Sequence, residues 1–244
     1  MTKKENKGKI ISIANLKGGV GKTTTAQNLG AGLKRSGKNV LFVDMDIRQN
    51  LTFALNGSDE YGSIYDLLQG ADIKTAIQKT PSGDLIRGDF RLSNYDVPEE
   101  QYKAILKPLQ SIYDFILIDT PPNNNTAVSA ALAASDSVII PVQANVFSVQ
   151  GLFNEAETIK AYECEIAGVL VTNYEKRGTF KRDYLEAIRE ECAAENIKMF
   201  NTVIRKNVAI EKAQSESKNI FDYDSRSNGA KDYSEFVKEV LKNE

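Results

Sequence analysis

Residues 15–24, with the sequence NLKGGVGKTT, combine glycine, lysine and threonine at the spacing of a phosphate-binding loop. Glycines lack a Cβ, so successive backbone N–H groups can face one concavity, and a helix that follows adds the positive end of its dipole. The pattern therefore predicts a seat for the β-phosphate of a nucleotide. In this seat Lys22 bridges the β- and γ-phosphates, Thr23 offers its hydroxyl to Mg²⁺, and Thr24 reaches the α-phosphate. The predicted contact residues of the loop are Gly18, Gly19, Val20, Gly21, Lys22, Thr23 and Thr24.

Aspartates follow two other apolar runs of the chain. Asp44 and Asp46 end one run, and Asp119 ends another. Open α/β sheets bind ligands at the carboxyl ends of their strands, so these carboxylates are candidates for work on the same nucleotide. Phosphoryl transfer requires positioning more than a strong base, and an ordinary aspartate suffices for it. Because the chain contains no histidine, a histidine base, a histidine metal ligand and a catalytic triad are excluded.

The elements that must position these residues alternate between apolar runs and amphipathic stretches with helical spacing. The runs are mostly continuous in apolar residues, as in strands covered on both faces. The expected strands are Lys9–Ala14, Asn39–Asp44, Asp114–Asp119, Ser137–Val142, Ile166–Thr172 and Ile197–Ile204. The expected helices are Lys22–Arg35, Asn125–Ala134, Val149–Tyr162, Thr179–Glu195 and Tyr233–Leu241. The sequence thus predicts an α/β fold: a single-domain P-loop NTPase whose mostly parallel twisted sheet is flanked by helices on both faces.

The segment 56–100 is less regular than the rest of the chain and is interrupted by glycines. We expect a short helix near Ile64–Gln69 and a strand at Asp84–Arg87, with loops between them. The chain has no internal repeat, no low-complexity segment and no linker long enough to separate two domains. We therefore expect residues 1–8 to be a flexible extension and residues 9–244 to form one domain.

Composition limits the class of protein further. Hydrophobic residues make up 41% and charged residues 26% of the 244 residues, which is ordinary for a globular chain. No apolar run approaches the roughly 18 residues of a membrane span, and the charged N-terminal stretch lacks an apolar segment behind it. Two cysteines, Cys164 and Cys192, without C-x-x-C spacing favour a cytoplasmic protein. The net charge of -2 provides no general attraction to nucleic acid, so such binding needs a local basic patch.

One feature of the loop departs from the standard phosphate-binding pattern, because Leu16 stands where the first glycine is usual. Instead, the segment from Lys17 to Thr23 resembles the deviant Walker A motif, K-G-G-x-G-K-[ST], of the ParA/MinD superfamily of ATPases. Further likeness to its ParA/Soj branch lies in residues 135–151, 203–213 and 223–230, and is weakest over 56–100. The resemblance implies that residues 9–244 form a ParA-type ATPase domain. It also implies that Lys17 reaches across a dimer interface to the nucleotide of a partner subunit.

The resemblance assigns roles to the acidic residues. It implies that Asp119 is the Walker B acid, which holds Mg²⁺ through a coordinated water, and that Asp44 supports the metal shell. Asp46 matches the residue that orients or activates the attacking water, and Lys17, Lys22 and Asp46 form the implied catalytic set. The adenine is expected between strand-end Thr172 and Asn173 and the loop beginning at Arg205. Around Asp46 the sequence departs from the family pattern, because Ile47 and Arg48 stand where proline and glutamine are usual.

A function follows from the ParA/Soj resemblance. It implies an ATPase with weak intrinsic activity that closes into a sandwich homodimer on binding MgATP and then coats nonspecific double-stranded DNA. Its implied partner is a ParB-type centromere-binding protein that stimulates hydrolysis, and its implied place is the cytoplasm, on the nucleoid. Whether the cargo is a plasmid or a chromosome stays open. Family matching favours Arg205, Arg226 and Lys231 for DNA contact; a second basic cluster is Lys176, Arg177, Lys181 and Arg182.

Other functions of related ATPases remain as alternatives. A MinD-like membrane-cycling ATPase needs a basic amphipathic C-terminal helix, whereas acidic residues balance the lysines of the tail KDYSEFVKEVLKNE. A nitrogenase-iron-protein-like electron carrier needs cysteines beside the Walker B strand, and Cys164 and Cys192 lie elsewhere. An ATP-gated adaptor with little hydrolysis is a third possibility, which the presence of Asp46 and Lys17 disfavours.

Overall fold

The computed structural model describes residues 7–122, 126–145, 156–162, 164–175 and 179–243. The strands are β1 (Lys9–Ile13), β2 (Val40–Asp44), β3 (Gln78–Thr80), β4 (Gly83–Ile86), β5 (Phe115–Asp119), β6 (Ser137–Gln143), β7 (Glu165–Tyr174) and β8 (Met199–Arg205). The longer helices are α1 (Lys22–Arg35), α5 (Glu99–Leu106), α6 (Thr126–Ala134), α8 (Thr179–Ala194), α9 (Val208–Ser215) and α11 (Asn228–Asn243). The short helices are α2 (Asn50–Ala54), α3 (Ile64–Leu68), α4 (Ile73–Ala76), α10 (Ile220–Tyr223) and the 3₁₀ turns η1 (Phe90–Asn94) and η2 (Lys107–Ser111).

The strands form one sheet in the order β3-β4-β2-β5-β1-β6-β7-β8. All neighbouring pairs are parallel except β3 with β4. In the centre of the sheet, Asp119 pairs in register with Asp44 on one side and with Ile13 on the other. The carboxyl ends of β1, β2 and β5 therefore lie at one level, and the loop that leaves β1 emerges beside the acidic end of β5, one strand away from that of β2.

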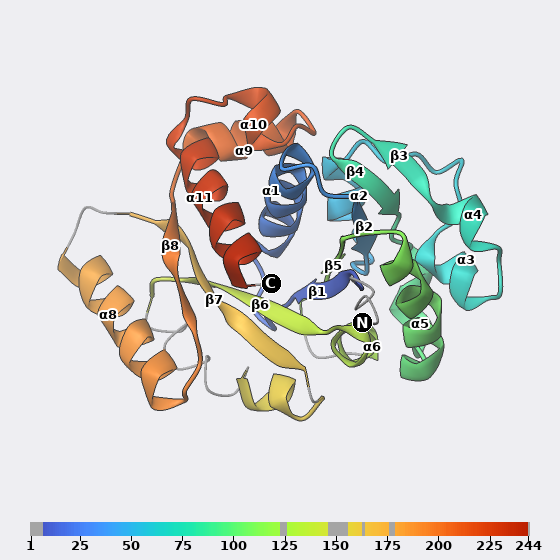
Figure 1. The fold of residues 1–244 in the computed structure, drawn as a ribbon, viewed down its shortest axis with the longest axis horizontal. Helices are drawn as coiled ribbons and strands as arrows, with labels where there is room; N and C mark the ends of the chain where they lie inside the picture. Colours follow the sequence, from blue (N-terminus) through green and yellow to red (C-terminus); the bar gives the residue numbers. More distant parts are fainter. Residues whose placement is uncertain (1–6, 123–125, 146–155, 163, 176–178, 244) are drawn as a thin grey trace, which may run out of the picture.

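Alternating side chains of the central strands enter different cores. Ile11 and Phe42 point into the core shared with α1 and α11, whereas Ile10 and Leu41 point into the core shared with α5 and α6. Beyond β6, Val138 and Val169 pack on the same face as α8. Figure 1 shows α1, α9, α10 and α11 on one side of the sheet and α5 and α6 near its other face. Both faces are thus covered, which explains why the strands are apolar in nearly every position.

Helix α1 lies close against the sheet because it contains glycine at the contact. A Cβ at Gly30 would come within 2.2 Å of the ring of Phe42, so no larger residue fits without displacement. Helix α11 runs beside α1 (Figure 1) and buries Tyr233, Phe236 and Val237. This packing fixes the direction of α1 and, with it, the loop at its N-terminus.

The observed architecture confirms the predicted fold class and most expected elements. Helix α1 has the expected bounds, and strands at all six expected positions are present with ends that differ by up to two residues. The expected helices over 125–134 and 149–162 are described only from 126 onward and from 156 onward; residues 156–160 are helical. Gly8, assigned to a flexible extension, exchanges hydrogen bonds with Gln110, at 2.9 Å from its N–H and 2.6 Å to its carbonyl.

The segment 56–100 is more ordered than its glycine content indicates. The short helix and the strand expected there are present as α3 and β4, but the sequence did not predict β3, α4 or α5, which begins at the end of this segment. Arg91 holds this segment together, because its guanidinium donates to Asp66 at 2.8 Å and also pairs with Asp89 at 2.5 Å. Hydrogen bonds from Arg91 and Ser63 outweigh the effect of burial and hold the pKa of Asp89 at about 2.

Candidate nucleotide-binding site

The loop between β1 and α1 has the backbone conformation that phosphate binding requires. Gly19 and Gly21 have φ angles of 74° and 91°, in the left-handed region that favours glycine. Gly21 is the N-cap of α1, and no side chain caps the first N–H groups of this helix. These N–H groups, together with the helix dipole, form an anion-binding seat.

Lys22 lies at the base of this loop and is 7% exposed. Its Nζ donates to the carbonyl of Asn15 at 2.8 Å and to that of Lys17 at 3.0 Å. The ammonium is thereby held under the loop, in the position from which a P-loop lysine meets the β- and γ-phosphates.

Thr23 and Asp119 are brought together as the predicted metal-binding residues. The Thr23 hydroxyl donates to Asp119 Oδ2 at 2.6 Å, while the buried Oδ1 has no hydrogen-bond partner among the described residues. Burial, with the nearby charge of Asp44, raises the pKa of Asp119 well above its usual value. A buried carboxylate with an unused oxygen beside a hydroxyl fits a Mg²⁺ shell that includes water.

No group of three or more histidine, cysteine or acidic residues that could hold a metal is present in the described ranges. This finding agrees with the way in which Mg²⁺ binds in nucleotide enzymes, through one or two protein groups, several waters and the phosphates of the substrate. The residues present therefore fit Mg²⁺ as a companion of the nucleotide.

Asp44 organises the loop that follows β2. Its Oδ1 accepts the backbone N–H of Asp46 at 3.0 Å, and its Oδ2 accepts both the N–H and the hydroxyl of Thr52, at 2.8 and 2.7 Å. Complete burial raises the pKa of Asp44 to about 6, against the lowering effect of these hydrogen bonds. The observed contacts give Asp44 a positioning role, and its part in the metal shell stays a prediction.

Asp46 lines a hollow of about 370 Å³ at the mouth of the loop, which we call the phosphate hollow. Its lining includes Gly18, Gly19, Gly21, Lys22, Thr23, Thr24, Asp46, Arg48, Asn50, Pro122 and Gln214. Asp46 is 4% exposed and accepts the N–H of Arg48 at 2.9 Å. Lys17 lies exposed on the rim, with its Nζ 3.4 Å from Asn145 Oδ1. The structure thus brings Lys22, Thr23 and Asp46 around one hollow and places Lys17 outside it.

A second hollow of about 190 Å³, the base hollow, adjoins the first. Thr172, Asn173, Arg205 and Asn207 line it, so the two segments expected to enclose the adenine do meet there. Arg205 also pairs with Asp232, with an Nη2–Oδ1 distance of 2.6 Å, and this hydrogen bond raises the pKa of the guanidinium.

The sequence did not single out several polar residues that complete the site. Gln143 donates from Nε2 to the Gly19 carbonyl at 2.8 Å, and Gln214 donates from Nε2 to the Thr24 hydroxyl oxygen at 2.6 Å. Thr52 connects Asp44 with Gly88, whose N–H it accepts at 3.0 Å. Of these residues, only Gln143 could have been identified from the sequence, because it stands at the end of an apolar run.

The residues expected to contact DNA differ in their surroundings. Arg226 and Lys231 are exposed, whereas Arg205 is engaged by Asp232 at the edge of the base hollow. In the second basic cluster, Arg182 is exposed; Lys176, Arg177 and the side chain of Lys181 lie outside the described residues. The free positive charges on the predicted DNA surface are thus Arg226 and Lys231 rather than Arg205.

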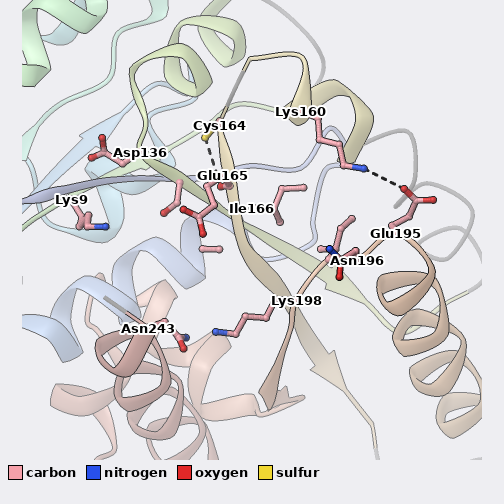
Figure 2. A pocket seen from close by; sticks show the side chains of 13 residues that line it. Lys9, Asp136, Lys160, Cys164, Glu165, Ile166, Glu195, Asn196, Lys198 and Asn243 are labelled. Carbon is pink, nitrogen blue, oxygen red and sulfur yellow. Dashed lines mark hydrogen bonds and ion pairs between the residues drawn. The ribbon is translucent and has the colours of Figure 1, made fainter.

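The opposite end of the sheet has a hollow of its own, of about 540 Å³ (Figure 2). Its wall carries both signs of charge, and Lys160 points toward Glu195, 3.3 Å away. Cys164 borders it, and burial raises the pKa of this thiol to about 12. A thiol with a raised pKa is a weak nucleophile at neutral pH, so Cys164 does not mark a reactive site.

Comparison with known proteins agrees with this geometry. A family described as an AAA domain matches residues 8–170. The sporulation initiation inhibitor protein Soj of Bacillus subtilis is 37% identical over 97% of this chain and 99% of its own length. The chain belongs to the ParA/Soj family of the deviant Walker A ATPases.

Solved structures of related ATPases have the same fold as this ParA/Soj member. An ATP complex of McdA from Cyanothece superposes with a TM-score of 0.85 at 27% identity, covering 96% of each chain. The cell division ATPase MinD from Pyrococcus furiosus superposes with a TM-score of 0.84 at 26% identity, covering 96% of this chain and 99% of the other. Among the described residues, helices long and apolar enough to cross a bilayer are absent.

Proposed function

We propose that this ParA/Soj member is an ATP-dependent DNA-partitioning ATPase that acts on a plasmid or a chromosome. The proposal rests on one observation: Lys22, Thr23 and Asp46 line a single hollow at the carboxyl end of the sheet, with Asp119 hydrogen-bonded to Thr23. These groups are the ones that binding and hydrolysis of a nucleoside triphosphate require. Soj of Treponema pallidum, 34% identical over 96% of this chain, is a chromosome-partitioning ATPase, which supports the cargo class.

Each protein group has a defined task in this reaction. The N–H groups at the start of α1 and the ammonium of Lys22 bind the phosphates and stabilise the charge on the transferred group. Asp46 orients the attacking water by accepting a hydrogen bond from it. Asp44 accepts the backbone N–H of Asp46, and Thr52 holds Asp44 in place. Thr23, and Asp119 through a water, would hold Mg²⁺, which would supply positive charge to neutralise the phosphates.

The exposed Lys17 supports an ATP-dependent homodimer. The side chain of Lys22 is buried under its own loop, whereas Lys17 lies exposed on the rim of the phosphate hollow, where a second subunit can approach. A two-fold dimer presents Arg226 and Lys231 twice and so doubles the charge available to the DNA backbone. Partner-stimulated hydrolysis by a ParB-type protein then releases the dimer from nonspecific DNA.

The packing of α11 disfavours the alternative of membrane cycling. The apolar residues Tyr233, Phe236 and Val237 of this helix are buried in the core of the molecule, at exposures of 0–3%. They are unavailable to a bilayer unless the helix leaves its place. On the outer face, Lys238 pairs with Glu235 at 2.7 Å, so a cationic surface for lipid is weak there.

ATP turnover and dimerisation test the proposal together. Asp46→Ala is expected to retain MgATP binding, lose hydrolysis and accumulate as the dimer, because the variant keeps the phosphate seat and loses only the group that orients water. Asp59→Ala is the matched control, since Asp59 is exposed outside the site. Phosphate release and light scattering with MgATP are the measurements. Turnover of Asp46→Ala at the parent rate would overturn the role of Asp46, and a parent that binds MgATP without turnover would favour an ATP-gated adaptor.

A further inference from the structure

The phosphate hollow and the base hollow meet at a small set of residues. Their shared lining consists of Gly19, Gly21, Thr24 and Gln214. Of these, only Gln214 comes from outside the loop 15–24. A nucleotide with its base in one hollow and its phosphates in the other must pass this junction with its ribose and α-phosphate.

The amide of Gln214 is held at the junction by a well-packed helix. Ile210 and Ala213 bury one side of α9 in the core, and Asn207 caps the helix by accepting the N–H of Ala209 at 2.8 Å. Just beyond α9, the N–H of Ile220 donates to the buried side chain of Asn28 in α1 at 2.8 Å. Gln214 is therefore placed by tertiary structure before any ligand arrives.

The hydrogen bond between Gln214 and Thr24 determines which atom the Thr24 hydroxyl proton can be donated to. Gln214 Nε2 donates to Thr24 Oγ1 at 2.6 Å, so the hydroxyl oxygen acts as an acceptor in this bond. A threonine hydroxyl has one proton to donate, and this proton stays available for a phosphate oxygen. The second N–H and the carbonyl of the Gln214 amide can serve a ribose hydroxyl in the same way.

We propose that Gln214 is a nucleotide-binding residue that recognises the junction of ribose and α-phosphate and holds Thr24 as a donor to that phosphate. This inference rests on the proposed nucleotide binding and assigns to it a residue from α9. Because the γ-phosphate lies at the other end of the phosphate hollow, Gln214 contributes to the affinity for both ADP and ATP and leaves the chemical step unchanged.

The first test measures MgADP and MgATP affinity by isothermal titration calorimetry. Gln214→Ala is expected to raise both dissociation constants roughly tenfold, the effect of a lost hydrogen bond to a charged group. Gln214→Glu has the same shape but cannot donate to Thr24 and brings a negative charge to the α-phosphate, so we expect a loss of roughly 100-fold. In turnover assays KM rises with little change in kcat. Gln69→Ala is the control, because Gln69 is exposed at the end of α3.

A double-mutant cycle separates positioning from general damage to the fold. Thr24→Val removes the hydroxyl and keeps the volume, and in this background Gln214→Ala should have a smaller effect than in the parent, since the part that acts through Thr24 is gone and only the ribose contact is left to lose. Melting temperatures without nucleotide monitor the fold of each variant.

The two proposals fail in different ways. The inference is overturned if Gln214→Glu binds MgADP as tightly as the parent, or if the Thr24→Val and Gln214→Ala losses add in full. The proposed function fails if the parent itself binds neither MgADP nor MgATP.

Discussion

The two ends of the central sheet carry hollows with opposite chemistry. At the carboxyl end, hollows of about 370 and 190 Å³ are bordered by the uncapped N–H groups of α1 and by Lys22 and Thr23, and the hydroxyl of Thr23 donates to the buried Asp119 behind them. At the amino end, a hollow of about 540 Å³ is bordered by side chains of both charge signs, among them the Lys160–Glu195 ion pair (Figure 2). The larger volume therefore does not mark the functional site. The uncapped N–H groups at the start of α1 mark it instead, because together with Lys22 and Thr23 they form a seat for phosphate.

The strongest test of this comparison replaces one lysine at each end of the sheet, Lys22 at the carboxyl end and Lys160 at the amino end. Among the described residues, Lys22 is the one lysine that lines the phosphate hollow, so we expect Lys22→Ala to lower MgATP affinity by roughly 1000-fold. Lys160→Ala, in the opposite hollow, should leave MgATP affinity unchanged. Calorimetry on both variants provides the measurement. An equal loss in the two variants would show that the amino-end hollow also takes part in nucleotide binding.

Asp119, the buried acid at the carboxyl end, should lower the stability of the nucleotide-free protein and at the same time be required for ATP turnover. Asp119→Asn keeps an oxygen for the Thr23 hydroxyl but removes a buried charge, so the nucleotide-free protein should gain about 1 kcal/mol in unfolding free energy. The same change weakens Mg²⁺ binding and should reduce turnover by roughly 100-fold. Urea denaturation and phosphate-release assays measure the two effects. A variant that loses both stability and turnover would indicate a structural acid instead.

The sequence indicated where the loop and the aspartates of the carboxyl end lie, because local backbone chemistry determines much of their placement. Gly19 and Gly21 are needed for positive φ angles, and aspartates at strand ends reach the edge of the sheet wherever the strands pair in register. Gln214 and Thr52 could not be predicted in the same way, since tertiary packing alone brings them to Thr24 and Asp44.

The segment 56–100 illustrates the same limit for the fold. Its pieces are too short for a clear periodicity, and hydrogen bonds between residues distant in sequence fix them. Gln78 accepts the N–H of Ser58 at 2.7 Å, and Arg87 donates to the carbonyl of Tyr61 at 2.7 Å. Neither contact follows from spacing along the chain, so the sequence did not predict β3 and α4, although it predicted α3 and β4.

The DNA surface should respond to charge reversal more weakly than the nucleotide site. Arg226 is exposed, and a dimer presents it twice, so Arg226→Glu should lower DNA affinity by roughly tenfold and reduce the salt slope by about one unit for each lost phosphate contact. Gel shifts with MgATP at several salt concentrations, on two unrelated sequences, provide the measurement. Lys74→Glu, an exposed charge reversal in α4, is the control. Unchanged affinity and slope for Arg226→Glu would move the DNA surface to residues 176–182.

The smallest effect is expected for Cys164 at the amino-end hollow. Burial raises the pKa of its thiol to about 12 and that of the Cys192 thiol to about 11, so at pH 8 only a minute fraction of either is thiolate in the folded protein. Because the thiolate is the reacting species, alkylation by iodoacetamide at pH 8 should be at least about 100-fold slower in the native protein than in the urea-unfolded chain. Cys164→Ala should leave MgATP affinity and turnover within about twofold of the parent, since a side chain outside the nucleotide site makes no transition-state contact. Mass spectrometry of alkylated protein, with and without MgATP, measures the first effect. Rapid native alkylation of Cys164 that MgATP suppresses would contradict the contrast between the two ends, because it would reveal a reactive thiol coupled to the nucleotide.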